Sequence, residues 1–337
     1  MSILMTGGGT GGHLAIIKAV KEHLETETLI YVGSTKGQDK QWFESDDDFK
    51  RKYFFETRGV VNQGLLGKVK SLFMMAKATL QGVKLIRLHG VKVVFSVGGF
   101  SAAPMAFAAK LTRTPLVIHE QNAALGSLNK LLQPYATAFI SSYLEKSPIK
   151  AYPIKEVFFQ KARVRTQLKN ILFLGGSQGA KAINELALIL APTLQNMGIG
   201  IIHQAGENHI GSIKNAYKEL GIEAEVFGFS TKLVDYMNEA DFAIARSGAS
   251  TLWELSAMGV PTLYIPYPYA ASDHQYHNAQ FLVKQNLAWV LRESELEEEK
   301  VYQILETNLE KVSHGLIAYV EKDGSQKIAD MCMQFTK

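Results

Sequence analysis

Short apolar runs alternate with amphipathic segments along the whole chain. In the first half, runs that read as buried strands occupy residues 2–5, 28–34, 91–97, 115–120 and 136–142. The segment after the first run, LAIIKAVKEHL, has the spacing of a helix with its charges on one face. Strands and helices in alternation predict a parallel sheet covered by helices.

The alternation starts again near residue 170 with NILFLGGSQGAKAINEL, a second strand, glycine turn and helix. The proline-marked, charged stretch 147–169 between the halves is interpreted as a linker. We therefore expect an α/β fold of two Rossmann-like, doubly wound parallel-sheet domains facing across a cleft. The expected domains are 1–155, 156–315 and a C-terminal helix in 316–337 that packs back on the first domain.

The N-terminal turn, TGGGTGGHL, stands between a strand and a helix. Glycines there let the backbone approach a ligand closely, and the helix start suits a phosphate. A P-loop would need Lys and Ser or Thr after the last glycine, where this chain has His13. Gly7, Gly9 and Gly12 match the dinucleotide spacing, but no acidic residue ends the second strand. A nicotinamide-dependent dehydrogenase is therefore the weaker interpretation.

The second half repeats this chemistry. After the turn GGSQG, the stretch RSGASTLWEL predicts a strand end, a tight turn and a helix that opens near Ser250 and Thr251. Glu254 follows about one turn later, so a diphosphate at the helix start and a ribose at this carboxylate would suit a sugar nucleotide. The alternative is that Glu254 only complements the helix dipole.

The stretch DHQYHNA brings together Asp273, His274, Gln275 and Asn278. Carboxylate and amide groups of this kind are natural partners for sugar hydroxyls. The competing interpretation is helix capping, chiefly by Asp273.

Composition limits the class of protein. The 337 residues are 47% hydrophobic and 20% charged, as in ordinary globular proteins. One cysteine, Cys332, allows no internal disulfide and no cysteine metal cluster, which fits a reducing compartment. A net charge of +4 is too mild to indicate nucleic acid as a partner. We expect no signal peptide and no membrane-spanning run.

Positive charge is concentrated between Arg51 and Lys92, a segment that contains nine Lys or Arg residues and a single acidic residue, Glu56. Apolar residues are interleaved with them, which is typical of a segment that lies on an anionic membrane surface. The alternative is a core helix with a solvated basic rim. The residues expected to contact a membrane are Leu65, Leu66, Lys68, Lys70, Leu72, Phe73, Met74 and Lys77.

Six motifs occur in a set order: TGGGTGGH, SVGGFSAAP, VIHEQNAALGSLNK, LFLGGSQGAKAIN, RSGASTLWELSAMGVP and DHQYHNA. In this order and at these spacings, the chain resembles the MurG family of bacterial glycosyltransferases, glycosyltransferase family 28. The resemblance covers nearly the whole chain and implies a GT-B fold. It also implies inverting transfer of GlcNAc from UDP-GlcNAc, without metal or cofactor, to the MurNAc 4-hydroxyl of lipid I (undecaprenyl-pyrophosphoryl-MurNAc-pentapeptide).

The product would be lipid II of peptidoglycan synthesis. The resemblance further implies a peripheral protein on the cytoplasmic face of the bacterial inner membrane, with a cell-wall synthesis complex as a partner. Another GT-B enzyme of UDP-sugars, a glycolipid synthase or a UDP-GlcNAc 2-epimerase, is the alternative.

The resemblance assigns site residues. His13, His119 and Glu120 are the catalytic candidates; His13 is our choice of base, and a hydrogen bond from His13 to the acceptor diphosphate is the rival role. The acceptor set is Thr10, Gly12, His13, Gly98, Gly99 and Phe100. The donor set is Thr10, Gly11, Gly12, Asn122, Lys155, Gly176, Ser177, Gln178, Phe229, Ser230, Ala249, Ser250, Thr251, Glu254, His274 and Gln275.

The chain departs from the family pattern in four places. Ile16 stands where the family has proline, and Phe100 where it usually has tyrosine. The interdomain signature reads AYPIK, so Lys155 replaces an arginine and supplies its charge without a bidentate fork. The region 38–52 is unlike the family and is expected to be a modified loop.

Overall fold

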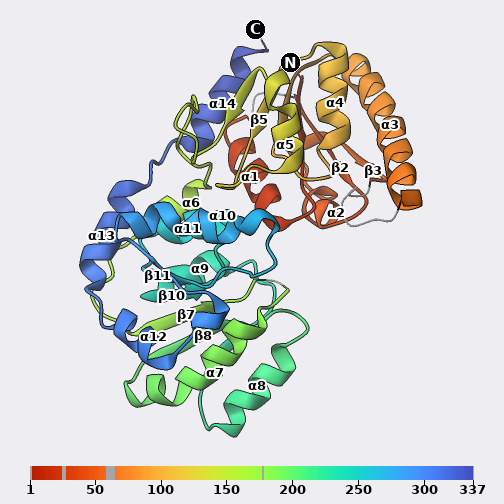
Figure 1. Ribbon diagram of the computed structural model, residues 1–337. Coiled ribbons are helices and arrows are strands. Elements are labelled where there is room, and N and C mark those ends of the chain that lie inside the picture. The colour runs from red at the N-terminus through yellow and green to blue at the C-terminus, as the bar shows by residue number, and fades with distance from the viewer. Residues whose placement is uncertain (1, 25–27, 58–64, 177, 337) are drawn as a thin grey trace. The chain divides into compact units, whose positions relative to one another are not determined.

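The structure is a computed structural model that describes residues 2–24, 28–57, 65–176 and 178–336, without the side chains of residues 65–69. The chain divides into two compact units (Figure 1). Unit 1 comprises residues 1–155 and 323–337, and unit 2 comprises residues 156–322.

Unit 1 contains a six-stranded, all-parallel sheet in the order β3-β2-β1-β4-β5-β6. Its strands are β1 (Ser2–Thr6), β2 (Thr28–Ser34), β3 (Phe49–Phe55), β4 (Val91–Ser96), β5 (Leu116–His119) and β6 (Ala138–Ile140). Its helices are α1 (Gly11–Lys21), α2 (Asp39–Phe43), α3 (Leu65–Leu88), α4 (Ala103–Thr112), α5 (Ser127–Leu132), the 3₁₀ turn η1 (Gln133–Tyr135) and α14 (Gly324–Gln334).

Unit 2 repeats this topology. Its sheet has the order β12-β11-β10-β7-β8-β9, which is the same strand order when it is counted from the β9 edge and its strands are numbered from β7. Its strands are β7 (Asn170–Leu174), β8 (Gly200–Gln204), β9 (Glu225–Phe227), β10 (Phe242–Ala245), β11 (Thr262–Tyr264) and β12 (Trp289–Val290). Its helices are α6 (Glu156–Gln160), α7 (Lys181–Asn196), α8 (Ile210–Glu219), α9 (Leu233–Glu239), α10 (Ala249–Ala257), α11 (His274–Lys284), α12 (Glu298–Leu305) and α13 (Leu309–Tyr319), with 3₁₀ turns η2 (Ala271–Asp273) and η3 (Glu293–Glu295).

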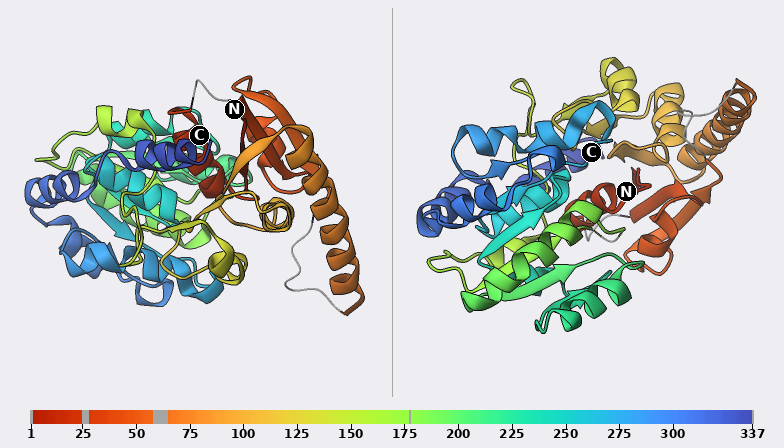
Figure 2. Two further views of the ribbon diagram at one scale, coloured as in Figure 1. Left: turned by 90° about the horizontal axis from the view of Figure 1, so that it is seen from above. Right: turned by 60° about the horizontal axis from the view of Figure 1, so that its bottom comes forward.

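The inner strands of both sheets, such as β1 and β7, are near-continuous apolar runs because helices flank the sheets (Figure 2). In unit 1, side chains such as Leu4, Ile30 and Val94 are fully or almost fully buried, and in unit 2 Ile171 and Phe173 are fully buried. Helices α3 and α4 lie side by side on unit 1. The predicted doubly wound α/β architecture is therefore confirmed.

The expected modified loop at 38–52 is regular structure instead. It contains α2 and the start of β3, the outer strand of the sheet. Lys21 on α1 holds this segment through two hydrogen bonds of 2.7 Å to the carboxylate of Asp46. The strand was not recognised because an edge strand has one exposed side, and Lys50 and Arg51 occupy exposed positions on it.

The predicted linker 147–169 is also more ordered than expected, because its second part is built into unit 2. The side chain of Arg165 is buried and donates to the carbonyl oxygens of Arg163 (2.6 Å), Met237 (3.1 Å) and Ala240 (3.2 Å). Burial, together with the charge of Arg163, lowers the pKa of Arg165 to about 9, so it stays charged at neutral pH.

The C-terminal return to unit 1 begins at Asp323 rather than at residue 316, because α13 belongs to unit 2. Helix α14 packs against α1. Its start is docked on the backbone, where the hydroxyl of Ser325 donates to the carbonyl oxygen of Ile154 at 2.8 Å. None of the helices described is long and apolar enough to cross a membrane.

Candidate functional site

Two glycine turns meet at the point where the strand order of unit 1 reverses, between β1 and β4. Doubly wound sheets bind ligands at this point, beyond the carboxyl ends of the strands. One turn, Gly7–Gly9, follows β1, and the other, Gly98 and Gly99, follows β4. A Cβ atom at Gly99 would lie 2.6 Å from the carbonyl oxygen of Gly8, so the two backbones touch and only glycine fits.

The first turn of α1 carries a histidine held by two side chains. The hydroxyl of Thr10 lies 2.9 Å from Nδ1 of His13, and the amide nitrogen of Gln121, just after β5, lies 3.1 Å from Nε2. The same amide nitrogen lies 3.3 Å from Nδ1, and either ring nitrogen of a histidine can donate or accept, so these contacts fix the orientation of the ring and not its tautomer. An oriented imidazole, in its unprotonated form, can accept a proton from a substrate hydroxyl.

His119 ends β5 and is fully buried. Its ring meets that of Tyr152 edge-on, with 5.6 Å between centroids, and neither ring nitrogen has a hydrogen-bond partner among the described residues. Burial, with a smaller effect of the charge of His13, lowers the pKa of His119 to about 3. A histidine with so low a pKa is a weak base at neutral pH.

The carboxylate of Glu120 organises the loop that follows it. One oxygen accepts from the backbone N–H of Asn122 at 3.0 Å. The other accepts from the backbone N–H of Gly126 and from the side-chain amide of Asn129, both at 2.9 Å. With these donors on a buried carboxylate, Glu120 is suited to hold this loop and Asn122 in place.

Phe100 covers the N-terminal glycine turn. A Cβ atom at Gly9 would lie 2.6 Å from the ring of Phe100, so the ring packs directly on the backbone of the turn. The first glycine turn is therefore packed against Gly99 and Phe100 of the second.

Unit 2 presents the same geometry at its own reversal point, between β7 and β10. Gly176 and Gln178 are exposed in the turn after β7, and Ser177 between them lies outside the described residues. After β10, Gly248 caps α10, whose first residues are Ala249, Ser250 and Thr251.

Glu254 lies beyond the first turn of α10, which contains no acidic residue, and it is half-buried. The effect of the helix dipole falls off within the first turn. The position of Glu254 therefore does not favour the dipole interpretation of this carboxylate.

The loop after β9 carries Phe229 and Ser230. The backbone N–H of Phe229 donates to the carboxylate of Glu207, and the amide of Gln204 donates to the carbonyl oxygen of Gly228 at 3.0 Å. The loop is thus tied to the turn after β8, which fixes the backbone at Phe229.

The loop before α11 is strained and clamped. Ser272 and Asp273 both have left-handed φ angles, 53° and 50°, a conformation that costs about 1–2 kcal/mol at each non-glycine residue. Arg292 donates to the carboxylate of Asp273 at 2.6 Å, and its guanidinium lies 4.1 Å from the centre of the Tyr276 ring. Asp273 occupies the N-cap position of α11, but its side chain makes no cap hydrogen bond, which counts against the competing interpretation that this carboxylate caps the helix.

This clamp directly precedes two of the predicted donor residues. Nδ1 of His274 lies 2.8 Å from the carbonyl oxygen of Ala271. The side-chain oxygen of Gln275 accepts from the backbone N–H of Tyr267 at 2.9 Å. Both side chains are therefore oriented by the loop that Arg292 holds.

Lys155 forms an ion pair of 2.8 Å with Glu22 at the C-terminal end of α1, and both side chains are about one-third exposed. Its ammonium is therefore engaged by a carboxylate within unit 1.

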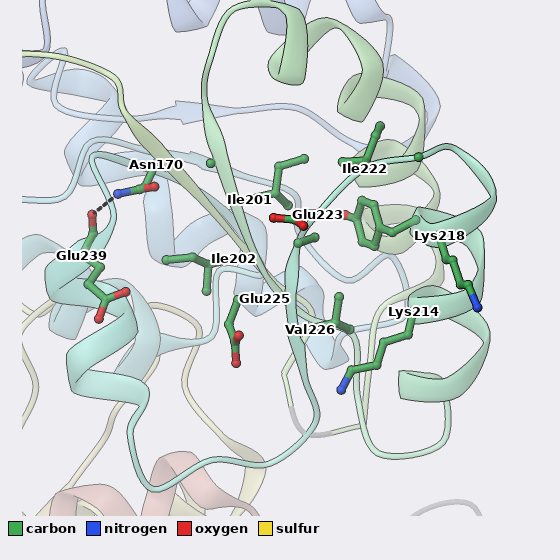
Figure 3. Close-up of a pocket in the computed structure, with 14 residues that line it drawn as sticks. Asn170, Ile201, Ile202, Lys214, Lys218, Ile222, Glu223, Glu225, Val226 and Glu239 are labelled. Carbon is green, nitrogen blue, oxygen red and sulfur yellow. Dashed lines mark hydrogen bonds between the residues drawn. The ribbon is translucent and has the colours of Figure 1, made fainter.

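Figure 3 shows a pocket of about 780 Å³ in unit 2. It is lined by residues at the amino-terminal ends of the strands, among them Asn170, Gly200 and Glu225, with Lys214 and Lys218 of α8. Because ligands of doubly wound sheets bind at the carboxyl ends, the pocket is not part of the candidate site.

Sequence reasoning did not find several residues that shape the site. These residues contact partners that are distant in the sequence. Gln121 contacts His13, Asp39 accepts from the backbone of Gly9, and Arg292 donates to Asp273. These contacts form only in the folded chain, so no local sequence pattern predicts them.

Comparison with known proteins agrees with this arrangement. Residues 3–141 match the N-terminal domain of glycosyltransferase family 28, and residues 170–330 match its C-terminal domain. The chain is 67% identical, over the full length of both proteins, to the UDP-N-acetylglucosamine--N-acetylmuramyl-(pentapeptide) pyrophosphoryl-undecaprenol N-acetylglucosamine transferase of Sulfurovum sp. strain NBC37-1.

Among solved structures, Acinetobacter baumannii MurG is similar, with a TM-score of 0.78 at 26% identity and 99% of each chain covered. The crystal structure of a putative UDP-N-acetylglucosamine 2-epimerase from Listeria monocytogenes has a TM-score of 0.65 at 12% identity over 97% of this chain and 94% of its own. That second likeness concerns the fold alone.

Proposed function

The chain belongs to glycosyltransferase family 28, and from this we infer that it transfers GlcNAc from UDP-GlcNAc to lipid I, with formation of lipid II and UDP. The observation that carries this inference is the full-length identity of 67% to a transferase of that name. The glycine turns at the reversal points of both sheets supply two sites suited to phosphate, one in each unit.

The reaction is a single displacement with inversion. The 4-hydroxyl oxygen of MurNAc forms a bond to the anomeric carbon of GlcNAc, the bond from that carbon to the UDP oxygen breaks, and a base takes the hydroxyl proton. We assign the base to the imidazole of His13, because Thr10 and Gln121 orient its ring in the first turn of α1. His119 and Glu120 are assigned to positioning, since one has a strongly lowered pKa and the other is saturated with donors.

The departing UDP gains negative charge that must be compensated. We assign this role to the N–H groups at the start of α10, around Ser250 and Thr251, where the helix carries partial positive charge. Glu254 is assigned to the ribose hydroxyls, and Gln275 and His274 to the GlcNAc. Thr10, Gly12 and the Gly98–Gly99 turn are assigned to the acceptor diphosphate.

Transfer of labelled GlcNAc to a lipid-pyrophosphoryl-muramyl acceptor, with EDTA present, tests the function. The expected products are a disaccharide lipid and UDP. Conversion of UDP-GlcNAc to UDP-ManNAc, without transfer of GlcNAc to the acceptor, would count against the transferase and in favour of the epimerase alternative.

Replacing Arg292 by alanine is expected to raise the KM for UDP-GlcNAc between about 2-fold and about 10-fold, because a lost hydrogen bond to the sugar costs about 0.5–1.5 kcal/mol. The reason is that Asp273 then loses the partner that holds its left-handed backbone, and Gln275 loses its fixed position. Steady-state kinetics measures the effect, and the affinity for UDP alone should change little.

The matched control is Lys300→Ala, which removes an exposed ion pair with Glu297 in the same unit. An equal rise in KM in both variants, or a parallel loss of UDP binding in Arg292→Ala, would argue against the positioning of the sugar contacts by Arg292.

We also propose that α3 contacts the membrane that holds the acceptor lipid. Along one face of this helix lie Lys70, Phe73, Lys77, Leu80 and Lys84, at spacings of three and four residues. The apolar side chains of this basic-apolar stripe are 73% exposed at Phe73 and 63% at Leu80. A stripe of exposed apolar and basic side chains fits an anionic lipid surface.

The opposite face of α3 explains why the stripe points outward. A Cβ atom at Gly82 would lie 2.8 Å from the sulfur of Met105 on α4, so the two helices pack closely there. Of the other predicted contacts, Leu72 is exposed and Met74 is half-buried. Those at Leu65, Leu66 and Lys68 concern side chains outside the described part of the structure.

The variant Lys70→Glu with Lys77→Glu is expected to weaken binding to vesicles of phosphatidylglycerol and phosphatidylcholine by at least about 30-fold, since each lysine near an anionic surface contributes about 1 kcal/mol. Vesicle sedimentation at fixed salt measures this change. The control is Lys214→Glu with Lys218→Glu on α8, which makes the same change in net charge in unit 2. Equal weakening in both variants would mean that overall charge, not α3, decides binding.

A further inference from the structure

A buried carboxylate lies directly beneath the N-terminal glycine turn. Asp39, the first residue of α2, has no exposed surface. Its Oδ2 accepts from the backbone N–H of Gly9 at 2.6 Å. Its Oδ1 accepts from the backbone N–H of Ser34 at 2.9 Å and from the hydroxyl of Tyr31 at 3.1 Å. The carboxylate thus ties the glycine turn to the end of β2.

The environment of Asp39 is unusual for a buried charge. No ion pair within the described part of the chain involves it, so its compensation comes from two peptide N–H groups and a phenol. Burying a carboxylate without a cation is costly, and proteins seldom do so without a reason. Burial, followed by the charge of Asp39, raises the pKa of the Tyr31 phenol, which therefore remains a donor.

The surrounding glycines fit this carboxylate. A Cβ atom at Gly8 would lie 2.6 Å from Oδ1 of Asp39, and one at Gly33 would lie 2.7 Å from the same oxygen. A Cβ atom at Gly37 would lie 2.7 Å from the Cα of Gly9. The segment that carries Asp39 therefore forms the floor of the turn and packs against its backbone with no side chain between.

The turn is held from the other side as well. Gly9 has φ +84° and packs under the ring of Phe100, and Gly8 packs against Gly99. Thr10 follows at once and contacts His13 through its hydroxyl. Any rotation of the peptide at Gly9 would therefore be passed to the pair that orients the imidazole.

We propose that Asp39 is a positioning residue for the transfer reaction: it turns the N–H of Gly9 inward and so fixes the backbone that places Thr10 and His13. This rests on the proposed function, in which His13 is the base. The inward N–H of Gly9 is occupied, so an acceptor diphosphate is bound by the N–H groups that follow it in the turn and at the start of α1.

Asp39→Asn tests this role with a side chain of nearly the same size. Its amide places a donor opposite the N–H of either Gly9 or Ser34, so one of the two bonds is lost. The expected result is a decrease in kcat of between about 10-fold and about 100-fold, because misplacement of a reacting group by about 1 Å has effects of that size. The KM for the acceptor should rise, while the KM for UDP-GlcNAc stays within about twofold.

The matched control is Asp46→Asn. Asp46 lies on the same segment, its carboxylate accepts from Lys21 on α1, and it has no hydrogen bond to the glycine turn. Both variants weaken the attachment of this segment, but only Asp39→Asn acts on Gly9. Amide hydrogen exchange of a peptide covering residues 7–13 is the second readout, and it should become faster in Asp39→Asn alone.

A decrease in kcat no greater than that of Asp46→Asn, or unchanged exchange at residues 7–13, would overturn the proposal. Should Asp39→Asn fail to fold, Tyr31→Phe removes the hydroxyl that contacts Asp39 and the carbonyl oxygen of Gly7, and it should show the same pattern at smaller size. Wild-type enzyme that transfers no GlcNAc would refute the proposed function, and the exchange comparison would still decide whether Asp39 holds the turn.

Discussion

Replacement of His13 by glutamine is expected to lower kcat by about 100-fold or more, because a general base contributes about 10²–10⁴-fold to a proton transfer. Glutamine retains polar contacts near Thr10 and Gln121 but cannot take the proton of the acceptor hydroxyl. Steady-state transfer at saturating UDP-GlcNAc and acceptor measures the change.

The result separates the two roles of His13. If the imidazole only binds the acceptor diphosphate, the KM for the acceptor rises and kcat at saturation remains near that of the wild type. His119→Gln is a useful comparison, since His119 lies nearby, is fully buried and has a pKa of about 3. A loss of turnover only in His119→Gln would transfer the role of base away from His13.

Replacement of Glu254 by alanine is expected to weaken binding of UDP and UDP-GlcNAc by between about 10-fold and about 100-fold, because hydrogen bonds to a charged group contribute about 1.5–3 kcal/mol. The two ribose hydroxyls would lose their acceptor. Isothermal titration with UDP measures the effect without any acceptor lipid.

Glu298→Ala is the matched control, since Glu298 is an exposed acid in the first turn of α12, where a contribution to the helix dipole is expected. If Glu254 had only that structural role, both variants would lose some thermal stability and neither would lose affinity for UDP. Preserved UDP binding in Glu254→Ala would contradict the assignment of the ribose.

The sequence predicts the fold well where the pattern is local. The apolar strands, the turns GGGTGG and GGSQG, and the start of α10 at Ala249 are set by neighbouring residues, so periodicity and glycine spacing suffice. The confirmed GT-B architecture and the family follow from the same motifs.

The sequence predicts the structure poorly where charged side chains are buried or lie on an edge strand. Arg165 is interpreted as part of a linker because arginine is normally exposed, yet carbonyl groups of unit 2 surround it. The β3 segment is overlooked because its basic residues hide an edge strand. Asp39 is 30 positions from Gly9, and only the folded sheet brings them together.

The chain passes from unit 1 to unit 2 and back, since α14 returns to pack on α1. A fragment cut after residue 155 would therefore lack a helix whose start is docked on Ala151 and Tyr152. The ring of Tyr152 in turn contacts that of His119. Removal of the C-terminal residues 323–337 would therefore disturb unit 1, whose other residues come from the N-terminal part of the chain. To produce unit 1 in isolation, residues 323–337 would have to be spliced to the end of 1–155 by a short tether.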